Sequence, residues 1–320
     1  MNVVIVGGGL TGLSAAFELE RLGVAYTLIE VKARLGGSLC TRRESGFVLD
    51  GSAFLLERYG VWAWLDDLGM ADALVSLGNY RDGDLVAFRA GTESLIDALR
   101  SRLTGTILTR MAVSSLGALT PTPNAPIGVC LENGVLIEAR GVIAAVPARY
   151  AAHMLYTLAP EPSLWLSAYQ YDPVVRVSLG FRWADLASDP ISALVASPPA
   201  WVKFLETHTL AERVPADHVL VRAGIRLTEQ IAAPDDALRR VRALIAAEPV
   251  VAWAHYWAEA DPLTRHLPEH AEAMDALDAA LPPNVIAVGS DYRALRLDQQ
   301  VEQGRAAARR LVSRLTGRRP

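Results

Sequence analysis

The sequence predicts an α/β protein with a Rossmann-like domain and a second, smaller α+β domain. The chain opens on a continuous apolar run, Val3–Val6, which leads through a glycine-rich turn into a helical pattern. Apolar runs of the same kind return at 141–146 and 284–289. Between them, residues 151–255 are rich in aromatic residues and proline, with alternating strands such as VVRVSLGF. Continuous apolar strands are typical of a buried parallel sheet, and alternating strands of a sheet with one polar face.

The first element is the start of a βαβ unit. Val3–Val6 would form a central strand, a helix is expected over 10–22 with Gly23 as its C-cap, and residues 25–30 form the next strand. The glycine-rich turn therefore lies at the carboxyl end of the first strand, where ligands bind in folds of this kind.

The later elements follow in chain order. We expect short helical patches around 61–68, a helix over 92–103, strands in 106–119, 127–138, 141–146 and 284–289, and a closing helix over 299–315. Asn133-Gly134 marks a hairpin turn. The predicted nucleotide-binding domain comprises 1–50, 91–150 and 283–320, and the predicted substrate domain comprises 51–90 and 151–282.

Composition excludes several classes of function. The chain has 320 residues, half of them hydrophobic, which suits two globular domains with real cores. Its net charge of −4 is too close to neutral for electrostatic capture of nucleic acid. Apolar stretches are too interrupted for a membrane span, and a first strand at Asn2 leaves no room for a signal peptide, so a cytoplasmic location is expected. Cys40 and Cys130 have no metal-ligand spacing, and no metal is expected.

Three glycines and an acid predict a dinucleotide. Gly7, Gly9 and Gly12 have GxGxxG spacing directly between strand and helix. The first permits the tight turn, the second lets a pyrophosphate approach the backbone, and the third lets helix and strand pack closely. Glu30 is placed to accept hydrogen bonds from a ribose diol and would repel a 2′-phosphate, which disfavours NADP. A glycine turn without nucleotide and an S-adenosylmethionine site are the alternatives.

A second pair of glycines, Gly36-Gly37, follows the acid almost at once. A nicotinamide-binding domain needs the acid but has no evident use for this pair. FAD is longer, and bare backbone at this point could approach its ribityl chain and ring without a clashing side chain. The pair therefore favours FAD.

With these motifs the sequence resembles the flavin amine oxidase superfamily, which includes monoamine and polyamine oxidases, protoporphyrinogen oxidases and renalase. Its members carry GxGxxG, a ribose Glu and a motif like RxGG, which stands here as Arg34-Leu35-Gly36-Gly37. GFVLDGSAF (46–54), RMAVSSL (110–116) and the region 284–311 are similar to further family segments. The overall length and layout resemble those of renalase, a compact member.

The resemblance implies a set of residues that bind FAD. Asp291 would reach the ribityl or phosphate region, the turn at 297–299 would face the flavin, and the helix N-terminus there would stabilise the reduced, anionic ring. Two departures are Ser38, where many members have arginine, and Ser290, which separates a glycine and an acid that are usually adjacent. No cysteine lies in the closing segment, so the FAD would be non-covalent. The implied set is Gly7, Gly9, Leu10, Thr11, Gly12, Glu30, Val31, Arg34, Gly36, Gly37, Ser38, Asp50, Gly51, Val113, Asp291, Leu297 and Asp298.

The implied chemistry is transfer of a hydride from a C–H bond of a small substrate to flavin N5, with reoxidation by oxygen to give hydrogen peroxide. The substrate would be a small amine, a reduced nicotinamide isomer or a porphyrinogen-like compound. Two alternatives stay open: an NAD-dependent dehydrogenase, and a non-catalytic flavin-binding protein. The oligomeric state has no signal in the sequence.

Pattern alone assigns no catalytic residue. Several relatives have a catalytic lysine near the flavin, but Lys32 and Lys203, the only lysines, sit in no family motif. For each aromatic candidate core packing is the alternative, and Arg176 could bind a carboxylate bidentately or form a surface salt bridge. His255 could serve as a base or be a structural histidine. The candidates for lining the flavin ring are Tyr169, Tyr171, Arg176, Trp257 and Tyr292.

Overall fold

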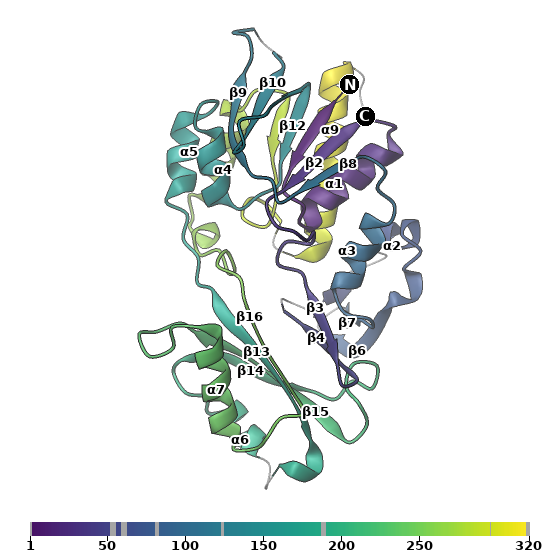
Figure 1. Ribbon diagram of the computed structural model, residues 1–320, viewed down its shortest axis with the longest axis vertical. Helices are drawn as coiled ribbons and strands as arrows, with labels where there is room; N and C mark the ends of the chain where they lie inside the picture. The colour runs from purple at the N-terminus through teal and green to yellow at the C-terminus, as the bar shows by residue number, and fades with distance from the viewer. Residues whose placement is uncertain are drawn as a thin grey trace. The chain divides into compact units, whose positions relative to one another are not determined.

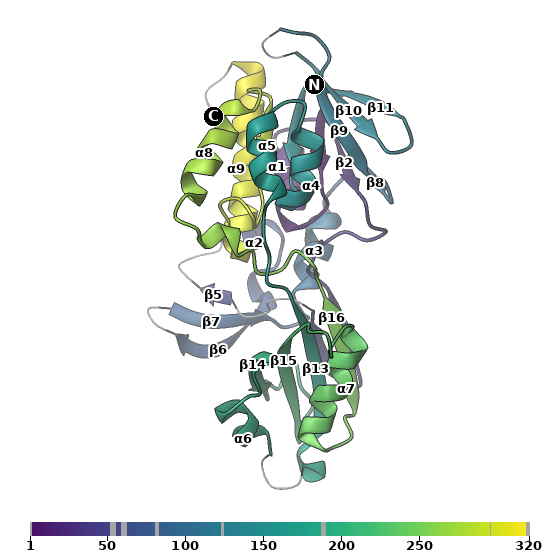
Figure 2. The same ribbon diagram turned by 90° about the vertical axis from the view of Figure 1, so that its left-hand side faces the viewer.

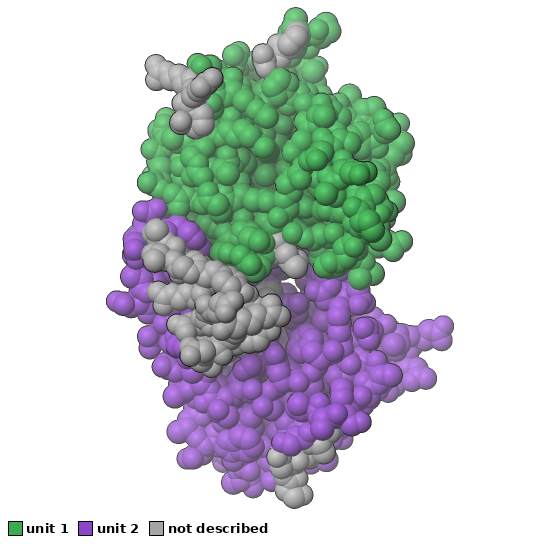
Figure 3. Space-filling view, turned by 180° about the vertical axis from the view of Figure 1, so that it is seen from behind, with its two compact units in different colours: residues 1–37, 95–170, 262–320 green, residues 38–94, 171–261 purple. Residues whose placement is uncertain are grey.

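The structure of the chain is a computed structural model that describes residues 2–51, 56–58, 63–80, 83–122, 125–186, 190–294 and 296–317. It contains two compact units, coloured separately in Figure 3. Unit 1 comprises Met1–Gly37, Leu95–Gln170 and Pro262–Pro320, and unit 2 comprises Ser38–Ser94 and Tyr171–Asp261. Each unit is therefore assembled from separate stretches of the sequence.

Unit 1 is built on a five-stranded parallel sheet with the strand order β17-β12-β1-β2-β8. The central strand β1 is buried along its whole length, which explains its continuous apolar run. The strands are β1 (Val3–Val6), β2 (Tyr26–Glu30), β8 (Thr106–Thr109), β12 (Gly141–Ala144) and β17 (Val285–Ala287).

The first and last helices of the chain, α1 (Leu10–Arg21) and α9 (Leu297–Thr316), lie side by side in unit 1 (Figures 1 and 2). Gly304 permits this close approach, because a Cβ there would overlap the Thr11 carbonyl oxygen. Arg305 donates to the buried Glu18 carboxylate at 2.8 Å. The closing helix therefore fixes the helix that follows the glycine-rich turn.

The other elements of unit 1 frame this core. A three-stranded antiparallel sheet has the order β11-β10-β9. Helix α3 begins two residues before the unit boundary at 94/95 and continues into unit 1. The elements are α3 (Glu93–Arg100), β9 (Val113–Ala118), β10 (Ile127–Leu131), β11 (Leu136–Ala139), α4 (Ala148–Leu155), α5 (Pro160–Ser167), η3 (Thr264–His266) and α8 (His270–Ala280).

Unit 2 is built on a four-stranded antiparallel sheet with the order β14-β15-β13-β16. One face packs its alternating apolar residues against α7 (Pro234–Ile245), with Val177, Val221 and Val241 in one buried cluster. Its strands and the neighbouring short helices are β13 (Val174–Arg182), η2 (Trp183–Asp185), α6 (Pro190–Ala196), β14 (Val202–His208), β15 (His218–Arg226) and β16 (Val251–Tyr256).

A hairpin covers part of the other face of this sheet. Phe47 and Leu49 from the hairpin form a second buried cluster with Leu220 and Val251. The remaining elements of unit 2 include a three-stranded antiparallel sheet with the order β5-β7-β6. The elements are β3 (Thr41–Glu44), β4 (Phe47–Asp50), β5 (Leu56–Arg58), α2 (Ala63–Asp67), η1 (Ala71–Ala73), β6 (Leu74–Tyr80) and β7 (Gly83–Phe88).

The predicted fold class is confirmed, as is the hairpin at Asn133-Gly134, where Gly134 has φ +84°. The predicted extended region 106–119 contains two strands in different sheets, because the chain turns at Arg110, which has φ +57°. The helical patch expected around 61–68 is found as α2, and residues 61 and 62 lie outside the described residues. The domain boundaries stay a prediction. They differ from the compact units by grouping 38–50 and 91–94 with the first domain, and 151–170 and 262–282 with the second.

No helix in the described part of the chain has the length and apolar character needed to cross a lipid bilayer. Over the same residues, no group of three or more His, Cys, Asp or Glu side chains is placed to hold a metal ion.

Candidate functional site

The turn between β1 and α1 in unit 1 needs glycine at two positions for packing alone. Gly7 has φ +102°, and a Cβ there would lie 2.9 Å from both the Ala145 carbonyl carbon and the Val146 side chain. A Cβ on Gly12 would overlap the Gly7 carbonyl oxygen. The chain's own backbone therefore excludes any side chain at Gly7 and Gly12.

Gly9 differs from these two glycines. Its φ is −73°, which any residue adopts, and the nearest atom to a Cβ there would be the Gly37 Cα at 3.9 Å. Gly9 is also partly exposed. Nothing within the described part of the chain requires glycine at this position, so the bare backbone is available to a ligand.

Helix α1 presents its N-terminus next to this bare position. Gly9 is its N-cap, and among the described residues no side chain caps the helix and no acid lies in its first turn. The N–H groups at the start of a helix have no partner within it and carry partial positive charge. Leu10 and Thr11 have buried side chains, so the helix offers its backbone donors. This arrangement suits a phosphate.

Glu30 is fixed at the carboxyl end of β2. Its side chain accepts a hydrogen bond from the Gly8 N–H at 2.7 Å and another from the Lys32 N–H at 2.8 Å. A carboxylate has about four acceptor positions, so these two bonds leave capacity for a ribose diol. The negative charge beside the glycine turn disfavours a ligand with a 2′-phosphate.

The second glycine pair packs directly against the first glycine turn. Gly36 and Gly37 have φ +102° and +60°, and the Gly36 N–H donates to the Gly8 carbonyl at 2.8 Å. A Cβ on Gly37 would lie 3.3 Å from the Gly9 Cα. Arg34 donates to the carbonyl oxygens of Leu35 and Gly37 at 3.1 and 2.8 Å and so braces the loop. The two motifs therefore form one continuous backbone surface.

The residues after β2 run beside the start of β9. The Met111 N–H donates to the Glu30 carbonyl at 3.1 Å. Val31 is 61% exposed, and Val113, two residues after Met111, is partly buried. This leaves apolar surface next to the Glu30 carboxylate, as the adenine end of a dinucleotide requires.

Asp291 lies in unit 1 with its carboxylate at the N-terminus of α4. It is 1% exposed and accepts a hydrogen bond from the Ala148 N–H at 2.8 Å. The Tyr169 hydroxyl donates to the Asp291 carbonyl at 2.6 Å. The Tyr292 hydroxyl donates to the Val146 carbonyl at 3.2 Å. Burial, together with the Asp291 charge, raises the pKa of both tyrosines well above the ordinary value, so both hydroxyls remain donors.

This geometry places three predicted site residues in the interior of unit 1. Tyr169 is 4% exposed and Tyr292 3% exposed, and both position the loop that contains Asp291. Core packing, the alternative that the sequence left open for the tyrosines, describes their surroundings. The part of Asp291 in holding FAD stays a prediction.

The N-terminus of α9 already has an acid of its own. Asp298, in the first turn, accepts hydrogen bonds from the Arg296 guanidinium at 2.9 and 3.1 Å. The Gln299 side chain accepts from the Arg296 N–H at 3.2 Å. Leu297 is buried. The helix dipole at this end is therefore partly compensated by Asp298.

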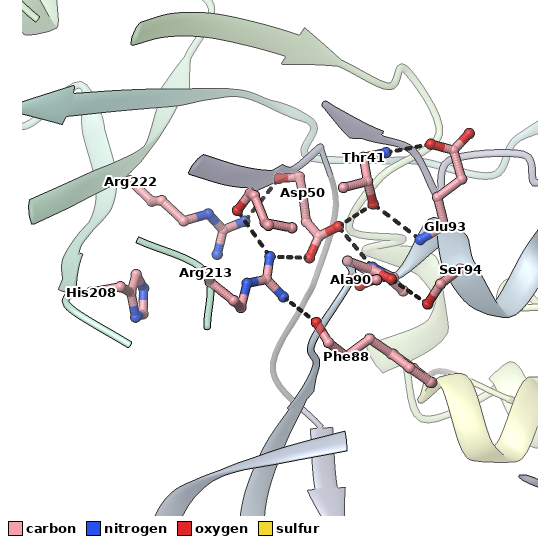
Figure 4. A network of polar contacts seen from close by, with 12 residues as sticks. Thr41, Asp50, Phe88, Ala90, Glu93, Ser94, His208, Arg213 and Arg222 are labelled. Atoms are coloured by element: carbon pink, nitrogen blue, oxygen red, sulfur yellow. Dashed lines mark hydrogen bonds and ion pairs between the residues drawn. The ribbon is translucent and has the colours of Figure 1, made fainter. Parts of the chain in front are cut away.

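In unit 2, Asp50 lies at the centre of a buried polar network (Figure 4). Its carboxylate accepts hydrogen bonds from Arg213 at 2.6 Å, Thr41 at 2.6 Å and the Thr92 N–H at 2.9 Å. The Asp50 and Arg213 side chains are 0% and 4% exposed. The Arg222 guanidinium donates to the Asp50 carbonyl at 3.3 Å. Asp50 thus joins β4, β15 and the start of α3.

Gly51 makes room for a cysteine–histidine pair. A Cβ at Gly51 would lie 2.5 Å from the Cys40 sulfur and 2.7 Å from the His255 ring. The Cys40 sulfur lies 3.6 and 3.7 Å from the two ring nitrogens of His255. The sequence separates these residues by 215 positions, and no motif indicates their proximity. Ser38, the first residue of unit 2, is partly buried.

The remaining candidates lie in unit 2. Tyr171 precedes β13, Trp257 follows β16, and both are partly buried. Arg176 lies within β13 on the face opposite α7, because its neighbours Val175 and Val177 belong to the apolar cluster on the α7 side. The structure thus divides the five candidates between the two units.

Lys203 is occupied by two acids of unit 2. Its ammonium group donates to the Asp172 and Asp261 carboxylates at 2.9 Å each. Burial lowers the pKa of Lys203, but the two carboxylates more than offset this and raise it. A lysine held in its charged form between two acids is suited to fixing the segments that precede β13 and follow β16, which also share a hydrogen bond from the Asp172 N–H to the Asp261 carbonyl.

Comparison with protein families finds two matches. A model described as flavin containing amine oxidoreductase matches residues 73–312. A model described as NAD(P)-binding Rossmann-like domain matches residues 5–68, which contain both glycine motifs and Glu30.

Among curated proteins, coproporphyrinogen III oxidase of Bacillus subtilis (strain 168) is 35% identical over 83 residues, 23% of this chain and 18% of that protein. Protoporphyrinogen oxidase 2 of Arabidopsis thaliana is 35% identical over 73 residues, 22% of this chain and 14% of that protein. The matched stretch therefore spans less than a fifth of each relative.

Two solved structures share the fold along nearly the whole chain. One is a protein of Exiguobacterium sp. 255-15, provisionally assigned as a protoporphyrinogen oxidase, with a TM-score of 0.76 and 15% identity over 96% of this chain and 97% of that one. The other is a putrescine oxidase bound to putrescine, with a TM-score of 0.68 and 15% identity over 98% and 99%.

Proposed function

The chain belongs to the family of flavin-containing amine oxidoreductases, and from this premise we propose that it oxidises a small molecule with bound FAD. The family is one of FAD-dependent oxidoreductases, and FAD is the cofactor. When bound, FAD accepts a hydride from a C–H bond of the substrate and passes the electrons on to dioxygen. The protein binds the nucleotide, orients the substrate and excludes water from the site.

The observation that supports this proposal best is the open position at Gly9. Gly7 and Gly12 are glycines because the chain's own atoms would meet a side chain there, whereas a Cβ on Gly9 would meet nothing nearer than 3.9 Å. Because packing within the protein does not require glycine at position 9, the absence of a side chain there allows a ligand to approach the backbone closely. Gly37 borders the same position, so the surface extends beyond the reach of a single phosphate contact.

The residues around Gly9 fit FAD. The start of α1 offers backbone N–H groups to the pyrophosphate, and Glu30, held by two backbone N–H groups, accepts the ribose hydroxyls. The loop braced by Arg34 holds Gly36 and Gly37 against the first turn, next to the place where the ribityl side of the cofactor would begin. The other residues of the predicted FAD set remain proposed contacts.

For the substrate, the named relatives support two of the three predicted classes. Coproporphyrinogen and protoporphyrinogen oxidases support a porphyrinogen-like substrate, and the putrescine oxidase structure supports an amine. The third class, a reduced nicotinamide isomer, is supported only by the compact length and layout, which resemble those of renalase. We assign the binding of the substrate to unit 2, and reoxidation by dioxygen is part of the proposal.

The cofactor proposal is tested by substitution at Gly9. Gly9→Val should lower the melting temperature of the FAD-free protein only slightly, because the added atoms enter open space and the loss is limited to the preference for glycine at an N-cap. It should lower FAD affinity by at least tenfold. Gly117→Val is the control, since a Cβ at Gly117 also meets nothing within 4 Å but lies away from the motif, in β9. Equal FAD affinity in both variants and the wild type would contradict the assignment.

The activity is tested by anaerobic mixing of the FAD-loaded protein with amines, porphyrinogens and reduced nicotinamide isomers. Bleaching of the flavin absorbance by one class, followed by recovery and hydrogen peroxide release on admission of air, is the expected result. Tight binding of NADH without binding of FAD would favour the NAD-dependent dehydrogenase. Bound FAD that no compound reduces would favour the non-catalytic flavin-binding protein.

A further inference from the structure

One guanidinium on the polar face of the unit 2 sheet has no partner of its own. Val175 and Val177 point into the α7 cluster, so Arg176 between them lies on the opposite face, directly across from Gly224 of β15 and His255 of β16. Within the described part of the chain, no hydrogen bond or ion pair reaches the Arg176 side chain.

The acids whose charges act on Arg176 form hydrogen bonds to other cations. Asp261 and Glu206 both act on Arg176 electrostatically. The Glu206 carboxylate, however, accepts from Arg222 at 2.8 Å, and Asp261 accepts from Lys203 at 2.9 Å. Asp50, whose charge acts on the neighbouring Arg222, is bound by Arg213 at 2.6 Å. Each of these acids thus already has a cation, and Arg176 is a partly buried positive charge on this face without a hydrogen-bonded carboxylate of its own among the described residues.

Arg176 is also partly removed from water. Burial lowers the pKa of its guanidinium, and the charges of Asp261 and Glu206 offset this only in part. Arginine nevertheless stays protonated in proteins. A partly desolvated charge without a hydrogen-bonded counter-ion is unfavourable, so the fold gains nothing from Arg176 at this position unless an anion joins it.

The neighbouring position on the sheet places an aromatic ring beside Arg176. Gly224, directly opposite, has no side chain, and a Cβ there would overlap the Phe204 ring. The cross-strand row therefore reads Phe204, Gly224, Arg176 and His255, with an aromatic ring lying over the glycine. An aromatic surface next to an unpaired guanidinium suits a small molecule with an apolar body and a carboxylate, which arginine binds bidentately.

We propose that Arg176 binds a carboxylate of the substrate, so that the molecule oxidised by this protein is a small carboxylate-bearing compound with an apolar body. That the bound carboxylate belongs to the substrate rests on the proposed function, whereas the anion site itself rests on the unit 2 residues alone. Arg176 is then a specificity-determining residue, and neutral or purely cationic amines are poor substrates.

Binding is measured by isothermal titration of the full-length, FAD-loaded protein with sodium benzoate, and with benzamide as the uncharged match, at constant ionic strength. Benzoate should bind the wild type at least tenfold more tightly than benzamide. Arg176→Gln should weaken benzoate binding about tenfold to a hundredfold, as the loss of a charge-assisted pair implies, and leave benzamide unchanged. Arg176→Lys should fall between the two, because it keeps the charge and loses the bidentate geometry.

Arg182→Gln is the matched control. Arg182 ends the same strand, on the same face as Arg176, and is exposed, so its removal lowers the charge of the protein by the same amount without entering the proposed site. Equal loss of benzoate affinity in both variants would show a general charge effect and overturn the proposal. Benzoate that binds the wild type no better than benzamide would overturn it as well.

A stability measurement separates binding from a structural role. Arg176→Met should keep or raise the melting temperature of the ligand-free protein, since it replaces an unpaired charge by an apolar chain of similar length. A lower melting temperature would show that Arg176 supports the fold and would count against the site. If benzoate binding follows these expectations while no compound reduces the flavin, the anion site stands and the proposed function fails. If neutral amines reduce the flavin efficiently and Arg176→Gln has no effect on benzoate binding, the proposed function stands and the anion site fails.

Discussion

The two units of this protein present binding groups in opposite ways. The candidate surface of unit 1 is made of backbone, from two short stretches at 7–12 and 36–37 that lie close together in the sequence. The polar face of unit 2 is made of charged side chains from β13, β14, β15 and the hairpin β3–β4. A backbone surface is specified by the residues that must lack side chains, and such residues form motifs. A side-chain surface is specified by partners that any distant strand can supply.

The difference extends to how each surface is stabilised. In unit 1, hydrogen bonds of main-chain groups, such as that from Gly36 to Gly8, hold the ligand-facing loops. In unit 2, buried ions hold one another, as Asp50 and Arg213 do. Substitutions that add atoms at the glycine motifs should therefore damage unit 1, and substitutions that remove one partner of a buried ion pair should damage unit 2.

The largest effect is expected where an added atom meets backbone in unit 1. Gly7→Ala puts a side chain on a residue with φ +102° and brings its Cβ against the Ala145 carbonyl group. Neither the backbone angle nor the carbonyl group can change without disturbing the parallel sheet. We expect a loss of about 4 kcal/mol or more in the free energy of unfolding, seen as loss of folded protein in circular dichroism. Gly117→Ala, with open space around its Cβ, should unfold like the wild type. A folded Gly7→Ala variant of normal stability would break the comparison.

The next effect belongs to unit 2. Arg213→Met leaves the buried Asp50 carboxylate without its cation and should lower the free energy of unfolding by about 3–5 kcal/mol in urea titrations. The exposed pair Arg242–Glu248 is the control, and Arg242→Met should change stability by less than about 1 kcal/mol. Similar small losses from both variants would mean that the Asp50 network contributes no more than a surface ion pair.

A smaller effect separates backbone strain from ligand contact. Gly37→Ala and Gly23→Ala both place alanine at a positive φ, +60° and +64°, and each should cost about 1–2 kcal/mol of unfolding free energy. Gly23 has no neighbour within 4 Å of its Cβ, whereas Gly37 lies against Gly9. Only Gly37→Ala should therefore also weaken FAD binding, by tenfold or more in a fluorescence titration. Parallel FAD losses in the two variants would assign the effect to strain alone.

The smallest effect concerns Glu18, a buried ion of unit 1. Burial raises the pKa of Glu18, but hydrogen bonds and charges of Arg305 and Arg309 outweigh it, so the pKa lies below its ordinary value of 4.5. A carboxyl with a depressed folded pKa stabilises the fold above its unfolded pKa and loses that contribution as the pH falls through the folded value.

Glu18→Gln should therefore lower stability at pH 7 by on the order of 1 kcal/mol, with the gap to the wild type closing as the pH falls below 4.5. Urea titrations at pH 7 and pH 3.5 measure it. A gap that is constant across this range would mean that Glu18 acts through shape and not through charge. The loss of unfolding free energy in this variant can then be compared with the loss in Arg213→Met, which disrupts the buried Asp50 network of unit 2.

The sequence predicted the fold class, the first βαβ unit and the family because their signals are local. Gly7, Gly12 and Glu30 form one spaced pattern within a single βαβ unit, although the atoms that exclude a side chain at Gly7 belong to Ala145 and Val146. It could not predict that Asp291 caps α4, or that Lys203 is held by Asp172 and Asp261, because those contacts join residues far apart in the chain. Nor could it pair Cys40 with His255, which lie together only because Gly51 leaves space.

By itself, then, the sequence determined the first strand, the glycine-rich turn, the acid and the second glycine pair, because their spacing is contained within residues 3–37. Only the tertiary structure decided which charges are neutralised and which is left over. The sequence does not distinguish Arg176, Arg213 and Arg222. The fold brings Glu206 and Asp50 into hydrogen-bonding distance of two of them, whereas Arg176 has no such carboxylate among the described residues. Electrostatic pairing depends on distances across the fold, and no short stretch of sequence contains them.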